Sequence, residues 1–207
     1  MAIDRKNIFY RIIKTNNKER SLLCYLSKNK NKGIVYTLTI RNAEYLHYEL
    51  KELGYKVGLY HGELDPDEKI INQNKFTSGE YNLMVSTNAF GMGIDIPDIR
   101  FVVEYDLPQS IEDFMQQTGR ASRDGKYAEG VLLFDIRDIS TNEYFIDNIK
   151  NDSISVHELN IIKLDRYQKL DRMIELGLSK KCIHQLISEY FGKKHPGKCQ
   201  MCSNCKK

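Results

Sequence analysis

No apolar run in the 207-residue sequence approaches the ~18–20 residues that a helix needs to cross a bilayer, and the start has no apolar signal core. Proline and glycine are scarce, at 4 and 13 residues, which excludes collagen-like and low-complexity chains. With 41% hydrophobic residues, the chain also lacks the composition of a disordered protein. We therefore expect a soluble, intracellular protein without membrane contacts.

The net charge is only +3, but its distribution along the chain is uneven. Residues 1–33 carry +7 and residues 179–207 carry +6, so the middle of the chain carries −10. Basic ends on an acidic body indicate local anion contacts rather than a protein that coats polyanions everywhere. Ordinary solvated lysines are the alternative for the N-terminal stretch.

Short β-rich runs alternate with amphipathic helical stretches over residues 33–135. The pattern predicts five strands, at 34–38, 57–60, 83–87, 101–105 and 131–134. It predicts helices at 42–53, after an N-cap at Asp65, and from Ser110 to Met115. Strands joined by helical crossovers form a parallel sheet that is covered on both faces, so the predicted fold class is α/β.

The pattern becomes helical after residue 135, with predicted helices at 139–149 and 156–176. Gly177 is expected to end the second of these, and Ser179 to cap a short helix that stops at Gly192. We therefore predict an α/β lobe over residues 1–138 and a small helical subdomain over residues 139–207.

Four of the five cysteines share the last 26 residues and a short spacing: Cys182, Cys199, Cys202 and Cys205. Three cysteines at x2 spacing in an intracellular chain indicate a metal site rather than disulfides. A thiolate quartet suits a closed, structural Zn²⁺ site, and an iron–sulfur cluster is the alternative. With four cysteines available, we expect His184 and His195 at the surface, and Cys24 as a small buried apolar residue.

Two further segments carry candidate chemistry. Residues 86–97 run from a strand into a Gly-x-Gly turn and an aspartate, which would let the backbone approach a ligand at a carboxyl end of the sheet; a plain tight turn is the alternative. Residues 116–125 place Arg120 and Arg123 three apart across a helix C-terminus. Such a pair can bind a γ-phosphate at two points, whereas most arginine pairs face solvent or a carboxylate.

Together these segments resemble motifs V and VI of superfamily-two helicases, and the run 88–95 is similar to the RecQ branch in particular. Residues 60–64, 106–108 and 110–112 follow the same family pattern. The resemblance extends from about Asp4 to Cys205. It implies a second RecA-like motor lobe followed by a four-cysteine zinc-binding subdomain, in an ATP-dependent 3′-to-5′ DNA helicase.

The resemblance also implies roles for single residues at the nucleotide. Arg123 would be the arginine finger that reaches the γ-phosphate of ATP, and Arg120 would contact the same phosphates or couple the site to the sheet. Gly93 and Asp95 would approach the ribose, while Gln116 would orient within the cleft.

For DNA, the resemblance implies that Thr87 touches the sugar–phosphate backbone. Where the family has arginine directly after a Ser/Thr, this chain has Thr39, then Ile40, then Arg41, so a contact from Arg41 is displaced by one position. Other departures from the family pattern are Gln117 for Glu, Ser122 for Gly and Ile96 for Lys.

The sequence contains no Gly-x-x-x-x-Gly-Lys-Ser/Thr loop and no acidic pair that could hold Mg²⁺ after a strand. We therefore expect a piece of a longer helicase, inactive as an ATPase alone, whose partners are an N-terminal RecA-like lobe with ATP and Mg²⁺, and DNA as single strands and duplex junctions. Its expected location is the cytoplasm or nucleoid of a bacterium, or the nucleus of a eukaryote.

Two other functions fit less of the sequence. One is a standalone zinc-stabilised module that binds nucleic acid or protein. The other is an RNA helicase of the DEAD-box kind, but that group has His-Arg where this chain has residues 116–118 and lacks the four-cysteine tail.

Overall fold

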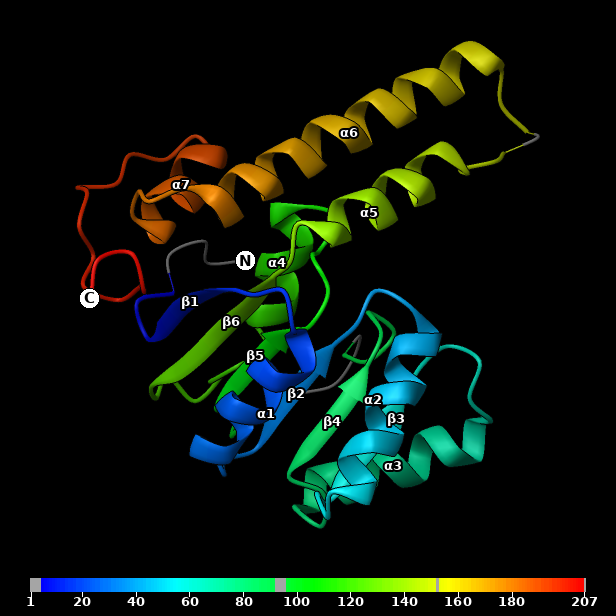
Figure 1. The fold of residues 1–207 in the computed structure, drawn as a ribbon, viewed down its shortest axis with the longest axis vertical. Coiled ribbons are helices and arrows are strands. Elements are labelled where there is room, and N and C mark those ends of the chain that lie inside the picture. The colour runs from blue at the N-terminus through cyan, green and yellow to red at the C-terminus, as the bar shows by residue number, and fades with distance from the viewer. Residues whose placement is uncertain (1–4, 92–95, 152, 207) are drawn as a thin grey trace.

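The computed structural model describes residues 5–91, 96–151 and 153–206. A parallel sheet lies at its centre, with strands in the order β1-β6-β5-β2-β4-β3 (Figure 1). The strands are β1 (Ile8–Lys14), β2 (Gly33–Tyr36), β3 (Val57–Tyr60), β4 (Leu83–Ser86), β5 (Phe101–Glu104) and β6 (Ala128–Phe134). The helices are α1 (Lys18–Lys28), α2 (Ile40–Glu52), α3 (Pro66–Ser78), α4 (Ile111–Thr118), α5 (Arg137–Asp147), α6 (Val156–Leu178) and α7 (Ile183–Tyr190).

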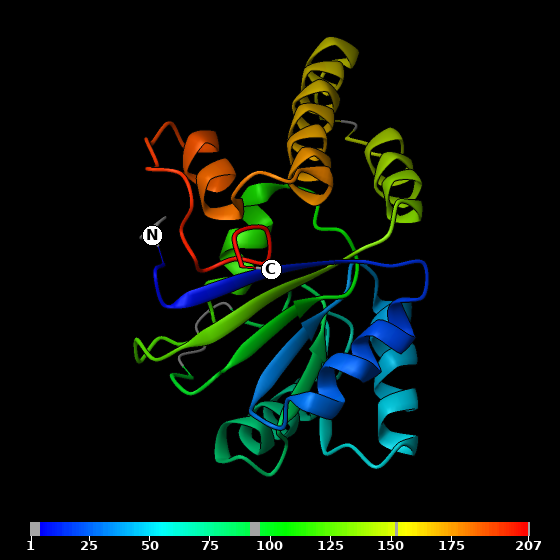
Figure 2. The same cartoon turned by 60° about the vertical axis from the view of Figure 1, so that its left-hand side comes forward.

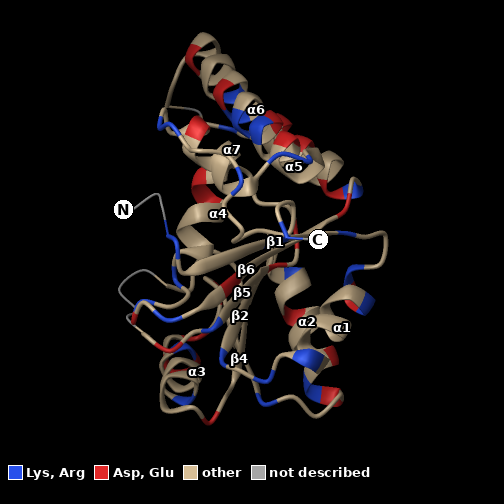
Figure 3. Cartoon of the chain, turned by 90° about the vertical axis from the view of Figure 1, so that its left-hand side faces the viewer, with Lys and Arg blue, Asp and Glu red and all other residues tan. Residues whose placement is uncertain are grey.

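Helices cover both faces of the sheet, because alternate residues of each buried strand point to opposite sides. On one face, Val35 and Val85 pack against α1 and α2. On the other, Ile34 and Met84 pack with Phe76 of α3. Lys, Arg, Asp and Glu lie mostly on the helices and loops, and the strands are largely free of charge (Figure 3). None of the helices in the described ranges is long and apolar enough to cross a membrane.

Helices α5 and α6 lie side by side and extend away from the sheet, whereas the C-terminal tail returns to β1 (Figures 1 and 2). The Tyr10 N–H donates to the Met201 carbonyl at 3.1 Å, and the Ser203 N–H donates to the Tyr10 carbonyl at 2.9 Å. Tyr10 and Cys202 therefore form a parallel bridge that covers the edge of β1.

The α/β and helical parts share a hydrophobic core. Tyr10 of β1, Phe114 of α4, Leu170 of α6 and Ile187 of α7 belong to one buried cluster, which also includes Cys202. The helical part is thus packed onto the sheet through α4 and β1. The boundary near residue 138 stays a prediction.

The structure confirms the α/β fold class and each of the five predicted strands. It adds two elements at the N-terminus that the sequence did not predict, because residues 8–14 and 18–28 form β1 and α1. Cys24 is exposed rather than buried, because α1 turns it away from the sheet. Gly177 lies within α6 against Phe134, and the N-cap of α7 is Cys182 rather than Ser179, which instead ends α6.

Several basic side chains of the N-terminal stretch have partners within the protein. Arg11 pairs with Glu129 at 3.2 Å, and Lys32 pairs with Asp98 at 3.0 Å. Lys14 donates to the Leu178 carbonyl at 2.9 Å. Much of the local positive charge predicted for anion contacts therefore has internal partners.

Candidate functional site

The turn that carries both arginines, Gly119–Gly125, lies at the amino-terminal ends of the strands, which we term the amino edge. The Ser122 N–H donates at 2.8 Å to the carbonyl of Ile99, just before β5. The Asn7 side chain, just before β1, donates to the Ser122 hydroxyl at 2.9 Å. The rule that places ligands beyond the carboxyl ends of strands therefore does not extend to this turn.

The Arg120 side chain contacts the segment that follows β4. It is half-buried, and its guanidinium donates a short hydrogen bond to the Gly91 carbonyl. Gly91 has a φ of 127°, and a Cβ there would overlap the Arg120 guanidinium. The absence of a side chain at Gly91 therefore leaves room for Arg120. The buried Nε of Arg120 has no hydrogen-bond partner among the described residues.

Arg120 and Arg123 both lie near the Tyr36 hydroxyl, which donates to the Phe90 carbonyl at 2.8 Å. Burial raises the pKa of Tyr36, and the positive charges of the two arginines oppose that shift. Arg123 is exposed, as is Gln116 on α4. The structure thus gathers three of the five predicted nucleotide residues near one end of α4. The other two, Gly93 and Asp95, lie outside the described residues.

The predicted DNA-contacting residues lie at the opposite, carboxyl edge of the sheet. Thr87 follows β4 directly and is only 7% exposed. Arg41 is exposed in the first turn of α2, whose N-cap is Thr39. The Thr39 hydroxyl accepts from the Asn42 N–H at 3.1 Å and is therefore occupied as a helix cap.

A buried ion-pair centre at the carboxyl edge was not predicted from the sequence. The Lys18 ammonium lies 2.6 Å from a carboxylate oxygen of Asp106 and 2.6 Å from one of Asp138. Asp106 also accepts from the Leu38 N–H at 2.9 Å, and Asp138 from the Leu107 N–H at 3.0 Å. Burial raises the pKa of Asp138, although the charge of Lys18 opposes this. The only sequence feature that pointed to this ion-pair centre was the family motif over residues 106–108.

A buried glutamate, Glu104, and a half-buried glutamine, Gln117, form a second polar pair next to a cavity of about 360 Å³. Glu104 is 2% exposed, and the Gln117 amide, oriented to satisfy both groups, donates to its two carboxylate oxygens at 2.7 and 3.1 Å. Burial first, and then the charges of Asp113 and Asp106, raise the pKa of Glu104 well above its usual value. A glutamate at position 117 would place two carboxylates together, whereas the Gln117 amide can donate to the Glu104 carboxylate.

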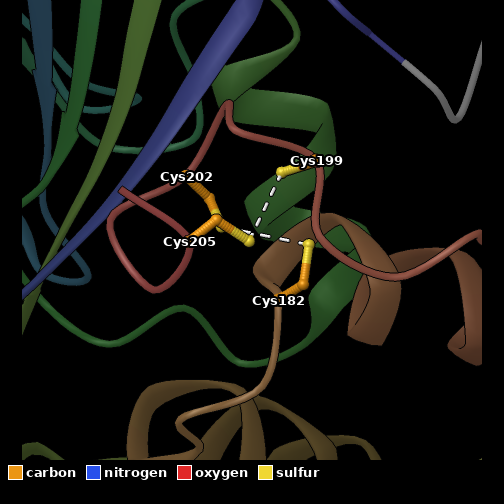
Figure 4. A group of neighbouring side chains, drawn as sticks. All are labelled: Cys182, Cys199, Cys202 and Cys205. Atoms are coloured by element: carbon orange, nitrogen blue, oxygen red, sulfur yellow. Dashed lines mark hydrogen bonds between the residues drawn. The ribbon is translucent and has the colours of Figure 1, made fainter. Parts of the chain in front are cut away.

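The four tail cysteines converge as predicted (Figure 4). Their sulfur atoms all lie within 4.8 Å of one another, with 4.0 Å between Cys199 and Cys205 and 4.0 Å between Cys182 and Cys202. A tetrahedron with metal–sulfur distances of about 2.3 Å has edges of about 3.8 Å, whereas a disulfide needs about 2.05 Å. Burial raises the pKa of Cys182 and of Cys199. The geometry fits a tetrahedral metal ion.

His184 is buried at 5% exposure, contrary to the predicted surface position. Its ring lies 4.8 Å from that of Tyr10, and its Nε2 lies 3.2 Å from the Met201 carbonyl oxygen. The side chain thus packs between β1 and the cysteine loop.

Residues 17–125 match the helicase conserved C-terminal domain family, and residues 136–206 match the RecQ zinc-binding family. This chain belongs to the RecQ helicase family. The ATP-dependent DNA helicase RecQ of Bacillus subtilis (strain 168) is 36% identical over 205 residues, which are 99% of this chain and 33% of that protein. The ATP-dependent helicase SGS1 of Saccharomyces cerevisiae is 30% identical over 99% of this chain and 14% of its own length. This RecQ-family chain therefore spans a third or less of these two relatives.

Two solved structures share the fold of the α/β part. The first is the E. coli DEAD-box protein SrmB bound to the regulator of ribonuclease activity A, with a TM-score of 0.57, 22% identity, and coverage of 73% of this RecQ-family chain and 92% of that chain. The second is the C-terminal domain of the DEAD-box protein Dbp5, with a TM-score of 0.55, 24% identity, and coverage of 71% and 89%. They place the parallel sheet and its helices in the RecA-like class.

Proposed function

We propose that this chain forms the second motor lobe (residues 1–138) and the zinc-binding subdomain (139–207) of an ATP-dependent DNA helicase that moves 3′-to-5′. ATP and Mg²⁺ would be held by a first RecA-like lobe, and closure of the two lobes would bring the arginine turn to the phosphates. Arg123 acts as the arginine finger, and Arg120 contacts the phosphates. Gln116, Gly93 and Asp95 contribute the remaining nucleotide contacts.

The observation that carries this proposal is the Gly119–Gly125 turn, which holds an exposed Arg123 beside a half-buried Arg120. Charge develops on the transferred phosphoryl group, and a guanidinium placed there stabilises it. Such a group needs a fixed backbone and an exposed side chain, and the turn supplies both. The chain's membership of the RecQ family supports the same role.

The test joins the first lobe of the B. subtilis relative ahead of this chain and measures ATP hydrolysis. Arg123→Ala should lower kcat by about 10³ or more, the usual effect of losing an arginine finger. Arg11→Ala is the control, because Arg11 is a partly exposed arginine of β1 that pairs with Glu129. The isolated chain should show no turnover. Turnover by the isolated chain that disappears in Arg123→Ala would overturn the proposal.

For nucleic acid, we propose that Thr87 and Arg41 contact the backbone of a single strand or a junction from the carboxyl edge. Backbone contacts carry no sequence information and weaken with salt. Arg41→Ala should weaken binding of a labelled single strand equally for different sequences and lower the salt slope by about 1. A salt slope identical to that of the parent chain would remove Arg41 from the interface.

For the tail, we propose that Cys182, Cys199, Cys202 and Cys205 hold one structural Zn²⁺. Ordering a backbone costs about 1–2 kcal/mol per residue, and residues 192–206 contribute few apolar side chains to offset it. Elemental analysis should give about one zinc per chain. A chelator should remove amide-exchange protection from the tail while β4 and β5 keep theirs. Metal-free protein with a protected tail would contradict this proposal.

A further inference from the structure

The arginine turn is held by two side chains from the N-terminal end of the sequence. Arg5 donates to three carbonyls of the turn: those of Gly119 at 3.2 Å, Ala121 at 3.0 Å and Ser122 at 2.8 Å. These three turn residues are buried, so their carbonyls need partners within the protein. A guanidinium carries five donors in a fixed plane and can satisfy several carbonyls together.

Asn7, the residue before β1, also binds the arginine turn, and we call Arg5 and Asn7 together the clamp. Its amide donates to the Ser122 carbonyl at 3.3 Å, the Ser122 hydroxyl at 2.9 Å and the Lys126 carbonyl at 3.0 Å. Its side-chain oxygen accepts from Arg5 Nε at 3.3 Å, which ties the two clamp residues together.

Ser122 is the point at which this clamp matters most. It is fully buried and has a φ of 53°, a left-handed conformation that a residue with a side chain seldom adopts. A conformation of this kind persists only where its surroundings determine it. Ser122 lies between Arg120 and Arg123 in the chain, so its backbone angles set the direction in which Arg123 leaves the turn.

We propose that Arg5 and Asn7 are positioning residues that fix the backbone of Gly119–Ser122 and thereby aim Arg120 and Arg123. The inference rests on the proposed function of those two arginines. A displacement of about 1 Å in a group that must meet a transferring phosphate can lower a rate by about 10²-fold. Neither clamp residue needs to touch the nucleotide, because both act on the main chain.

The first experiment uses the chain as it is and measures amide hydrogen exchange. Arg5→Lys keeps the charge but loses the planar fork, and Asn7→Ala removes the second set of donors. Both should accelerate exchange at Ala121, Ser122 and Gly125 by about tenfold or more, while amides of β2 and β5 keep their rates. Arg11→Lys, a change of the same type in the neighbouring strand β1, should leave the turn unaffected. Unchanged exchange at the turn in both clamp variants would overturn the inference.

The second experiment measures ATP hydrolysis in the fusion with the first lobe. Arg5→Lys should lower kcat by about tenfold or more and leave KM for ATP nearly unchanged, because the loss arises in the transition state. A turn that exchanges faster while kcat stays at the parent value would also overturn the positioning role. If Arg123→Ala leaves kcat unchanged while Arg5→Lys still loosens the turn, the finger assignment fails and the clamp on the backbone holds.

Discussion

The contact between Gly91 and Arg120 gives a sharp prediction about how the arginine is held. Gly91→Ala would place a Cβ inside the Arg120 guanidinium and force an alanine into a φ of 127°. The unfavourable backbone conformation should cost about 1–3 kcal/mol. Loss of the charged hydrogen bond to the Gly91 carbonyl should cost a further ~1.5–3 kcal/mol. The sum is about 2.5–6 kcal/mol.

The assay is urea unfolding of the isolated chain, with Arg120→Ala and the double variant completing a cycle. Arg120→Ala alone removes the same hydrogen bond, so the double variant should lose it only once. The two substitutions should therefore be less than additive by about 1.5–3 kcal/mol. Gly62→Ala is the control, because a Cβ at Gly62 meets no atom within 4 Å. Simple additivity, or a Gly91→Ala variant as stable as Gly62→Ala, would refute the contact.

The two buried polar centres give the remaining predictions, all read from unfolding curves. Because the folded pKa of Glu104 is raised, its stabilising contribution is present below the unfolded pKa and is lost as the pH rises through the folded pKa. The free energy of unfolding of the parent chain, relative to that of Glu104→Gln, should therefore fall by up to about 1.4 kcal/mol per pH unit from about pH 4.5 upward. A difference in unfolding free energy that does not change with pH would contradict this. Gln117→Glu should destabilise the chain at neutral pH by about 1–3 kcal/mol, and adding Glu104→Gln should restore much of the loss by exchanging the donor and the acceptor. Lys18→Met should cost about 3–5 kcal/mol at neutral pH, because it leaves Asp106 and Asp138 without a counter-charge. The loss should be smaller in acid, because burial raises the pKa of Asp138 and the protonated group needs no counter-charge; an equal loss at both pH values would argue against a buried ion centre.

The sequence allowed prediction of the elements whose signals are local. Strands β2 to β6 were found because each is a short apolar run next to a turn, and the cysteine cluster was found because its spacing is short. The strand at residues 8–14 was missed because charged residues surround it, although its run of isoleucine and aromatic residues was the available signal. Its pairing with β6, some 120 positions away, is fixed only by the folded sheet.

The contacts that organise the candidate sites were beyond sequence reasoning for the same reason. Arg5 meets carbonyls 114 to 117 positions along the chain, and Lys18 meets carboxylates 88 and 120 positions away. No periodicity or spacing encodes such partners. The burial of His184 also depends on a distant neighbour, because the tail folds back onto Tyr10 of β1.

Helix α4 connects the two edges of the sheet. Its N-cap, Ser110, follows the Asp106–Leu107 segment at the carboxyl edge, and its C-cap, Gly119, begins the arginine turn at the amino edge. Eight residues at 1.5 Å per residue span about 12 Å, so a single rigid element joins the two regions. Its buried face, with Phe114 and Met115, packs into the core that also contains Tyr10 and Cys202. Helix α4 is therefore a rigid, packed link between the Asp106–Leu107 segment and the arginine turn.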